Sequence, residues 1–258
     1  TFSSVKRKDL DKVITISSNV ISGYNPTEVN SKIDLVLKNY PLPNGYSYKF
    51  GGEQQEQEEE MAFLSNAFMI ALFLVFIIIV AQFNKIMTPL IIMSSIILST
   101  IGVFLGLLIF NMDFVVVMTM IGIISLIGIV VNNAIVLIDF IELNRKRKLI
   151  EKKSKLEVSS IIDCITEAGR TRLRPVILTA LTTILGLMPL ALGMNFDFVK
   201  FFTLYEVHFY LGGDNMVFFG PIAWAIIFGL TFATLLTLLV IPSMYLIQVR
   251  LNRFLKLS

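Results

Sequence analysis

Five long hydrophobic runs dominate the chain from residue 61 onward. They cover about residues 61–83, 86–110, 114–140, 176–194 and 217–249. A helix rises about 1.5 Å per residue and the hydrocarbon core of a bilayer is about 30 Å thick, so each run predicts a membrane-spanning helix. The last run exceeds what one crossing needs, and we expect part of it to tilt or to follow the membrane interface. Residues 53–258 are therefore predicted to form an all-α membrane bundle.

Residues 1–52 follow a different pattern, which is typical of a soluble segment. Residues 13–21 and 46–50 are rich in β-branched or aromatic residues and favour strands. Between them, residues 26–40 have an apolar face at helical spacing, with Asn25 as a candidate N-cap and Pro26 at the first helical position. A β-α-β unit of this size cannot bury a core of its own. We therefore predict part of a larger α+β subdomain whose other strands lie elsewhere.

Positive charge is concentrated in the link between the third and fourth runs, residues 142–174. Ten of its residues are basic: Arg145, Lys146, Arg147, Lys148, Lys152, Lys153, Lys155, Arg170, Arg172 and Arg174. Basic links stay in the cytoplasm, whereas the links at 111–113 and 195–216 contain only one base, Lys200. The sequence thus predicts that residues 1–52 are periplasmic and that the C-terminus is cytoplasmic. Within the basic link, Leu156, Ile161, Ile162, Ile165 and Ala168 share one face, which suggests a helix lying on the membrane surface.

Composition agrees with a membrane protein and argues against catalysis. The chain is 55% hydrophobic and 16% charged, and a net charge of +3 gives no reason to expect a nucleic-acid partner. His208 is the only histidine and Cys164 the only cysteine, so neither a catalytic constellation nor a metal-spaced cluster is evident. We expect no enzyme activity, no metal site and no cofactor.

Polar residues inside the hydrophobic runs are the candidate functional groups. Asn132 and Asn133 are adjacent amides that point about 100° apart on a helix, so at least one should face inward. They can make a structural hydrogen bond between helices or take part in an ion or proton route. Thr179, Thr182 and Thr183 can bond to their own helix or line the same polar spot.

Small residues in the second and third runs suggest close helix packing. Gly102 and Gly106 have the spacing of a small-xxx-small motif, and Gly122 and Gly128 thin the following run. We expect all four glycines to admit a neighbouring helix.

Several motifs, in this order, resemble the hydrophobe/amphiphile efflux permeases of the resistance-nodulation-division (RND) superfamily. They are Gly51-Gly-Glu53 with the following Gln/Glu run, Gly128 to Asp139 (GIVVNNAIVLID), Arg170 to Thr179 (RTRLRPVILT), Gly186 to Leu190 (GLMPL), and Phe219-Gly-Pro221 with Val240-Ile-Pro242. The resemblance covers essentially the whole chain. It implies the last part of the second periplasmic domain followed by the last five of twelve transmembrane helices.

The resemblance also implies a function. Such permeases lie in the inner membrane and export drugs or other toxic amphiphilic solutes by proton antiport, with the proton gradient as energy source. They are homotrimers joined to a periplasmic adaptor protein and an outer-membrane channel. Two alternatives stay open at this point: a heavy-metal-exporting RND permease, and a truncated or non-transporting membrane scaffold.

The candidate coupling residues implied by this resemblance are Asn132, Asn133, Thr179 and Arg172. The family often has a lysine just before its Asn-Ala-Ile motif, and Asn132 occupies that position, while Asn133 is the motif asparagine. A neutral amide cannot pair with an acid as a charge or cycle a proton at physiological pH. The departure implies an altered coupling network or a substitute cation. The family's aspartate pair belongs to a fourth transmembrane helix that lies outside this segment.

Overall fold

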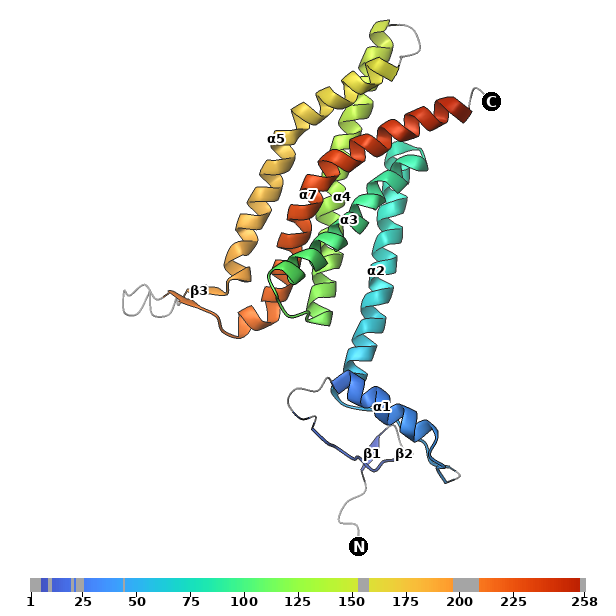
Figure 1. Cartoon of the computed structure of the whole chain (residues 1–258), viewed down its shortest axis with the longest axis vertical. Helices are drawn as coiled ribbons and strands as arrows, with labels where there is room; N and C mark the ends of the chain where they lie inside the picture. The colour runs from blue at the N-terminus through green and yellow to red at the C-terminus, as the bar shows by residue number, and fades with distance from the viewer. Residues whose placement is uncertain are drawn as a thin grey trace. The chain divides into compact units, whose positions relative to one another are not determined.

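The computed structural model describes residues 6–8, 11–19, 21, 26–43, 45–152, 158–196 and 209–255. The chain divides into two compact units, residues 1–58 and 59–258. Figure 1 shows the order of the elements.

The first unit consists of a short hairpin, a helix and irregular segments. Strand β1 (Arg7–Lys8) pairs antiparallel with β2 (Asp11–Lys12), and helix α1 covers Pro26–Lys38. The predicted helix with Pro26 at its first position is confirmed, whereas the candidate cap Asn25 lies outside the described residues.

The two strands predicted at residues 13–21 and 46–50 are wrong. The described residues of both segments are irregular, and Ile14 and Ile16 are 86% and 93% exposed. A β-branched segment forms a strand only when another strand supplies the ladder, and the described part of the unit offers none to these residues. The sequence of these two segments favours strands, but the described part of this chain provides no strand with which they could pair.

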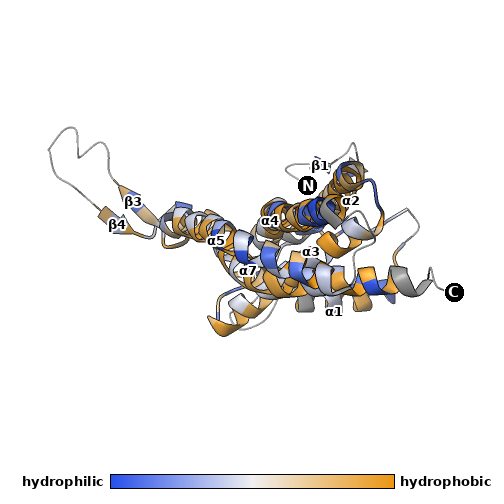
Figure 2. Ribbon diagram, turned by 90° about the horizontal axis from the view of Figure 1, so that it is seen from above, coloured by the Kyte–Doolittle hydropathy of each residue, from blue (hydrophilic) through white to orange (hydrophobic). Residues whose placement is uncertain are grey.

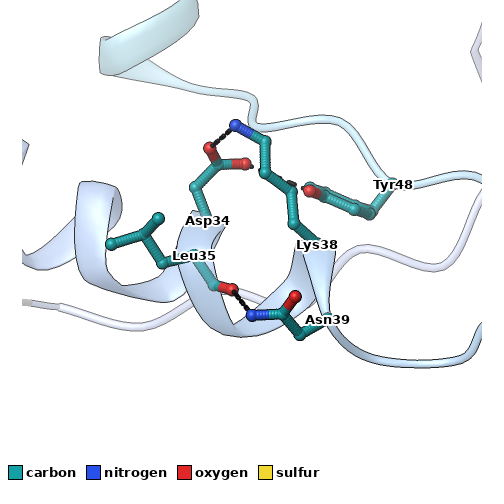
Figure 3. A network of polar contacts seen from close by, with 5 residues as sticks. All are labelled: Asp34, Leu35, Lys38, Asn39 and Tyr48. Atoms are coloured by element: carbon teal, nitrogen blue, oxygen red, sulfur yellow. Dashed lines mark hydrogen bonds and ion pairs between the residues drawn. The ribbon is translucent and has the colours of Figure 1, made fainter.

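A small polar network joins α1 to the segment after it (Figure 3). The Lys38 ammonium lies 2.6 Å from one oxygen of Asp34, and the Tyr48 hydroxyl donates to the other oxygen at 3.1 Å. The hydrogen bond from Lys38, followed by that from Tyr48, lowers the pKa of Asp34. The contribution to stability is therefore present above the unfolded pKa of the carboxyl and is lost as the pH falls through the folded value. Because Lys38 is well exposed, this is a local tie and not a major source of stability.

The second unit contains five helices that are long and apolar enough to cross a membrane. They are α2 (Glu53–Phe83, whose first turns belong to the first unit), α3 (Met87–Ile109), α4 (Val116–Lys152), α5 (Val158–Ala191) and α7 (Asp214–Leu255). A hairpin of β3 (Met194–Phe196) and β4 (Phe209–Leu211) connects α5 to α7. The predicted bundle of five membrane helices is confirmed, and Figure 2 shows hydrophobic residues along α3, α5 and α7.

The helices are longer than the hydrophobic runs that predicted them. Helix α4 continues past residue 140 to Lys152, and α7 is one helix of 42 residues with Pro221 and Pro242 inside it. Figure 1 shows α7 changing direction towards its C-terminal end. A proline removes one backbone donor and crowds the preceding turn, so it bends a helix that neighbouring helices keep intact.

The separate surface helix predicted between the third and fourth runs does not form. Residues 158–191 are one continuous helix, with Pro175 and Pro189 inside it. Ile161 and Ala168 are buried in the bundle core, and Ile165 packs against the same cluster. These three residues of the predicted apolar face are covered by helices of the bundle and not by a membrane surface, whereas Ile162 is 39% exposed. Leu156 lies outside the described residues.

Helix α7 is the centre of the bundle and packs against α3, α4 and α5. Half of the hydrophobic window is buried in each of α3, α4 and α7, whereas only 11% is buried in α2 and in α5. Helices α2 and α5 therefore present long apolar faces to lipid or to the rest of the protein.

Glycines allow the close approach of α7 to its neighbours. A Cβ added at Gly102 would lie 2.5 Å from the Cβ of Phe232, and one added at Gly106 would overlap Phe228. On α7 itself, a Cβ at Gly229 would overlap Leu126 of α4 and approach Val103 of α3. Gly122 meets Ala225 in the same way. The predicted packing role is thus confirmed for Gly102, Gly106 and Gly122.

We predict that Gly106→Ala lowers the stability of the full-length protein by about 1–3 kcal/mol, because the added methyl group collides with the stem of Phe228. The measurement is the thermal unfolding midpoint in detergent. Gly186→Ala is the matched control, since this helical glycine has nothing within 4 Å of the added carbon and gains only helix propensity. Equal midpoints for the two variants would contradict the packing role.

Candidate functional site

The predicted polar residues of the third and fourth runs come together around one cavity. Its volume is about 330 Å³, and its lining residues lie on α4 and α5: Gly128, Ile129, Asn132, Asn133, Thr179 and Thr183. Four of these six side chains are polar, although both helices are predominantly apolar. The share of one water in the liquid is about 30 Å³, so the cavity has room for several waters or a hydrated ion.

Helix geometry explains why these residues meet. Asn132 and Asn133 occupy successive positions of α4, whereas Thr179 and Thr183 are four residues apart and lie on one face of α5. Helices α4 and α5 contact each other directly, which brings the amide pair opposite the hydroxyl pair.

The threonine hydroxyls bond to their own helix. Thr179 donates to the carbonyl of Val176 at 2.9 Å, and Thr183 donates to the carbonyl of Thr179 at 2.8 Å. Thr182 also bonds back, to Leu178 and Thr179, but it does not line the cavity. Thr179 and Thr183 therefore do both of the things predicted for them. Each hydroxyl group donates its hydrogen within α5, and each residue also lines the cavity.

The two amides have no such partners. Asn132 is exposed and Asn133 half-buried in this chain, and neither makes a side-chain hydrogen bond within the part of the chain that the structure describes. A structural hydrogen bond between described helices, one interpretation of this pair, is thus not formed. The amides are left facing the cavity without a partner among the described residues.

Gly128 differs from the packing glycines. A Cβ built at this position meets nothing within 4 Å, and the residue lines the cavity. The expectation that Gly128 admits a neighbouring helix is therefore wrong within this chain. Its missing side chain contributes open space beside Asn132.

Arg172 does not line the cavity. It lies seven residues before Thr179 on α5, about 10 Å along the axis, and its guanidinium carbon is 4.5 Å from the centre of the Phe140 ring on α4. Its Nε is buried without a hydrogen-bond partner among the described residues. The guanidinium thus joins α5 to α4 by a cation–π contact at the end of the bundle that carries most of the basic residues, called here the basic end.

Two further polar contacts hold the basic end together. Lys85, after α2, lies 2.5 Å from Glu142 of α4, and Arg145 of α4 donates to the hydroxyl of Tyr245 on α7 at 3.3 Å. Tyr245 is only 2% exposed, so its hydroxyl is reached from inside the bundle. These basic side chains make structural contacts that charge counting alone did not reveal.

The two other singled-out residues do not take part in the cavity. Cys164 is a fully buried free thiol that lies away from the lining residues, and His208 lies outside the described residues. Among the described residues, no group of three His, Cys, Asp or Glu side chains could hold a metal ion.

A second cavity, of about 240 Å³, was not predicted. It lies where α5 ends and α7 begins, and it is lined by Pro189, Leu190, Gly193, Met194, Asn195, Asn215, Met216 and Phe219. The Asn195 amide donates to the carbonyls of Gly193 and Gly212, which closes this corner. The signal available in the sequence was the group of turn residues Gly193, Gly212 and Gly213, all of which adopt positive φ.

Five helices long and apolar enough to cross a membrane, with a polar cavity between two of them, define a helical membrane bundle. The model of the AcrB/AcrD/AcrF family matches residues 2–196. The chain therefore belongs to this family of RND permeases, as its motifs indicated, and its place is in the inner membrane.

Relatives extend the match over nearly the whole chain. The swarming motility protein SwrC of Bacillus subtilis is 31% identical over 95% of this chain, and the multidrug resistance protein MdtC of Erwinia tasmaniensis is 28% identical over 97%. The chain covers only 20% and 22% of these two relatives. A crystal structure of a heavy metal efflux pump matches with a TM-score of 0.63 at 24% identity, over 87% of this chain and 19% of that one. At this identity the match supports the fold alone.

We predict that Arg172→Ala destabilises the full-length protein by about 0.5–2 kcal/mol through loss of the contact with Phe140. The check is a double-mutant cycle with Phe140→Leu, read as unfolding midpoints. The two changes should not add, because each removes the same contact. Arg174→Ala, an exposed base on the same helix, is the control and should leave the midpoint within error. Additive losses would rule out the cation–π contact.

Proposed function

We propose that this chain is the C-terminal membrane portion of an RND permease that exports drugs or other toxic amphiphilic solutes at the expense of an inward ion gradient. The observation that carries the proposal is the polar cavity of Asn132, Asn133, Thr179 and Thr183, which opens between α4 and α5 of an otherwise apolar bundle. Burying polar groups in a bilayer is costly, and such groups mark ion and proton routes. The family resemblance makes the proton the expected ion.

The amphiphile class is supported by the relatives that are multidrug resistance proteins, at 28–29% identity. The heavy metal efflux pump favours metal export as the second candidate, but through its fold alone. The described residues offer no cluster of acidic, histidine or cysteine ligands for a metal. We therefore rank amphiphile export first.

The assembly proposed for the full-length protein follows the same resemblance. It is a homotrimer that works with a periplasmic adaptor protein and an outer-membrane channel. The apolar faces left uncovered on α2 and α5, each only 11% buried, are consistent with helices that pack against further parts of the permease and lipid. A truncated scaffold would leave the polar cavity without a coupled reaction.

Asn132→Lys tests the coupling role of the cavity. In proteoliposomes that contain the full-length protein, we expect export of a fluorescent amphiphile to change at least about tenfold in its dependence on the pH gradient, because lysine adds a charge and a titratable group beside Asn133. Asn132→Gln keeps a neutral amide and is the control. Export by the lysine variant with the wild-type dependence on the pH gradient would remove the cavity from the coupling route.

Cysteine labelling tests the proposed orientation, with the β3–β4 hairpin periplasmic and the basic end cytoplasmic. Leu211→Cys, 74% exposed in the hairpin, should react with an impermeant thiol reagent in intact cells. Ile150→Cys, 77% exposed near the end of α4, should react only after the cells are permeabilised. Exposed positions are needed because Cys164 is buried, so its failure to react would not show on which side of the membrane it lies. Labelling in the opposite order would invert the topology.

A further inference from the structure

The β3–β4 hairpin that connects α5 to α7 has one apolar face and one polar face. In an antiparallel pair, residues that lie directly opposite one another share a face, and successive residues of a strand alternate between the faces. The three pairs of this hairpin are Met194–Leu211, Asn195–Tyr210 and Phe196–Phe209. In the described part of the hairpin, the outer two pairs therefore make one face apolar, whereas the middle pair gives the opposite face an amide and a phenol.

The polar face is directed towards the turn that leads into α7. The Asn195 amide donates to the carbonyls of Gly193 and Gly212. A Cβ built at Gly213 would lie 3.7 Å from the Asn195 amide nitrogen and 4.0 Å from the Tyr210 ring. Both residues of the polar face thus lie against this turn, so the apolar face is directed away from it.

The apolar side chains form one exposed surface. The rings of Phe196 and Phe209 pack across the two strands, with their centroids 5.2 Å apart. Met194, Phe209 and Leu211 are all exposed, although each side chain is large and apolar. A contiguous apolar surface of this kind is typical of contact with a membrane or with a partner protein.

The position of the hairpin favours the membrane. The segments of α5 and α7 that are long and apolar enough to span a bilayer are Ser159–Ala191 and Asn215–Leu251, so β3 follows the end of one span and β4 precedes the start of the next. Figure 1 shows β3 running across the direction of α5, and Figure 2 shows both strands beyond α5 on the side away from α4. A hairpin that leaves the ends of two membrane helices sideways stays at the level where the hydrocarbon core meets the lipid headgroups. Aromatic side chains are common at this level.

We infer that the β3–β4 hairpin is an interfacial anchor, whose apolar face dips into the bilayer leaflet opposite to the basic end while its polar face stays against the turn before α7. The partner is the boundary between the acyl chains and the headgroups of the lipids, which suits a face of Phe, Leu and Met side chains. Such an anchor fixes the depth in the bilayer at which α5 ends and α7 begins. It does so whatever solute the permease exports.

The test compares the two faces of β4 with one fluorescent label. In the full-length protein with its other exposed cysteines replaced, Phe209→Cys and, separately, Tyr210→Cys are labelled with a nitrobenzoxadiazole fluorophore and reconstituted in vesicles of phosphatidylcholine and phosphatidylglycerol. Tyr210→Cys is the matched control, because Tyr210 is the next residue of the same strand, is also exposed and points to the opposite face. A lipid that carries a nitroxide near the top of its acyl chain should quench the label at residue 209 at least about twofold more than the label at residue 210. Iodide, present on both sides of the vesicle membrane, should quench the two labels in the reverse order.

Three results would overturn the inference. Strong quenching of both labels by iodide, with none by the nitroxide lipid, would place the hairpin in water. A label at residue 209 that neither quencher reaches would show that another part of the protein covers the apolar face. Equal quenching of the two labels by the nitroxide lipid would show that the apolar face is not the one directed to lipid.

Leu211→Cys extends the test along the apolar face. It should follow Phe209→Cys in its quenching by the nitroxide lipid, which guards against a local rearrangement caused by one substitution. The interface contains water, so this cysteine still reacts with an impermeant thiol reagent, but only from its own side of the membrane. The depth of the hairpin and the side on which it lies are thus measured independently.

Discussion

Close packing of α7 against α3 and α4 is the constraint on which the rest of the bundle depends. Between apolar helices in lipid, burial of hydrophobic surface gives no net driving force, so association relies on the fit of one surface to another. Gly102 and Gly106 of α3 receive Phe232 and Phe228 of α7, and Gly229 of α7 receives side chains of α3 and α4 in return. The interlock is reciprocal, with a glycine on each side opposite a bulky residue on the other. Helix α7 is thereby held at the centre, and α5 packs against it from a more peripheral position.

The same residue type creates space on the other side of α4. Gly122 faces α7 and admits it, whereas Gly128 faces away from any neighbour and leaves the cavity open. The two glycines are six residues apart, which turns them to different sides of the helix. One face of α4 is therefore packed tightly and another borders a polar space. This division allows a membrane helix to keep its position while part of its surface borders an open polar space.

The hydrogen-bond partners of the polar side chains also point to the cavity between α4 and α5. Many hydroxyl groups within the bundle bond to a carbonyl of their own helix, as Ser95, Ser99 and Thr234 do, and so are satisfied without a ligand. Asparagine amides cannot be satisfied in this way as completely, because each carries two donors and one acceptor. Asn132 and Asn133 stand out because, within the described residues, their amides are left unpartnered beside a cavity. Other polar atoms of the bundle, such as Asn144 Nδ2 and Gln248 Oε1, also lack a partner, but their residues do not line this cavity.

Much of this could be predicted from the sequence, for physical reasons that differ between the parts. Hydrophobic runs of about twenty residues or more satisfy their backbone hydrogen bonds in a bilayer by forming helices, so the five membrane helices followed directly. Asn132 and Thr179 could be named because polar residues are rare in such runs. The strands at 13–21 and 46–50 failed because a strand depends on a partner that the local sequence does not contain. Gly128 could not be separated from Gly122, because a glycine in a sequence does not show whether its open side is filled.

Polar contacts connect the helices at the basic end of the bundle, whereas a cavity lies between α4 and α5 further along the helices. Lys85 with Glu142, Arg145 with Tyr245, and Arg172 with Phe140 all connect different helices within a few turns of the same end. Arg172 joins α5 to α4 about two turns from Thr179, which lines the cavity between the same two helices. A ligand that bridged Asn132 on α4 and Thr183 on α5 would add an attraction between the two helices at that level. Binding of such a ligand would favour one spacing of α4 and α5 over others, which is the physical requirement for a ligand to bias a helix arrangement.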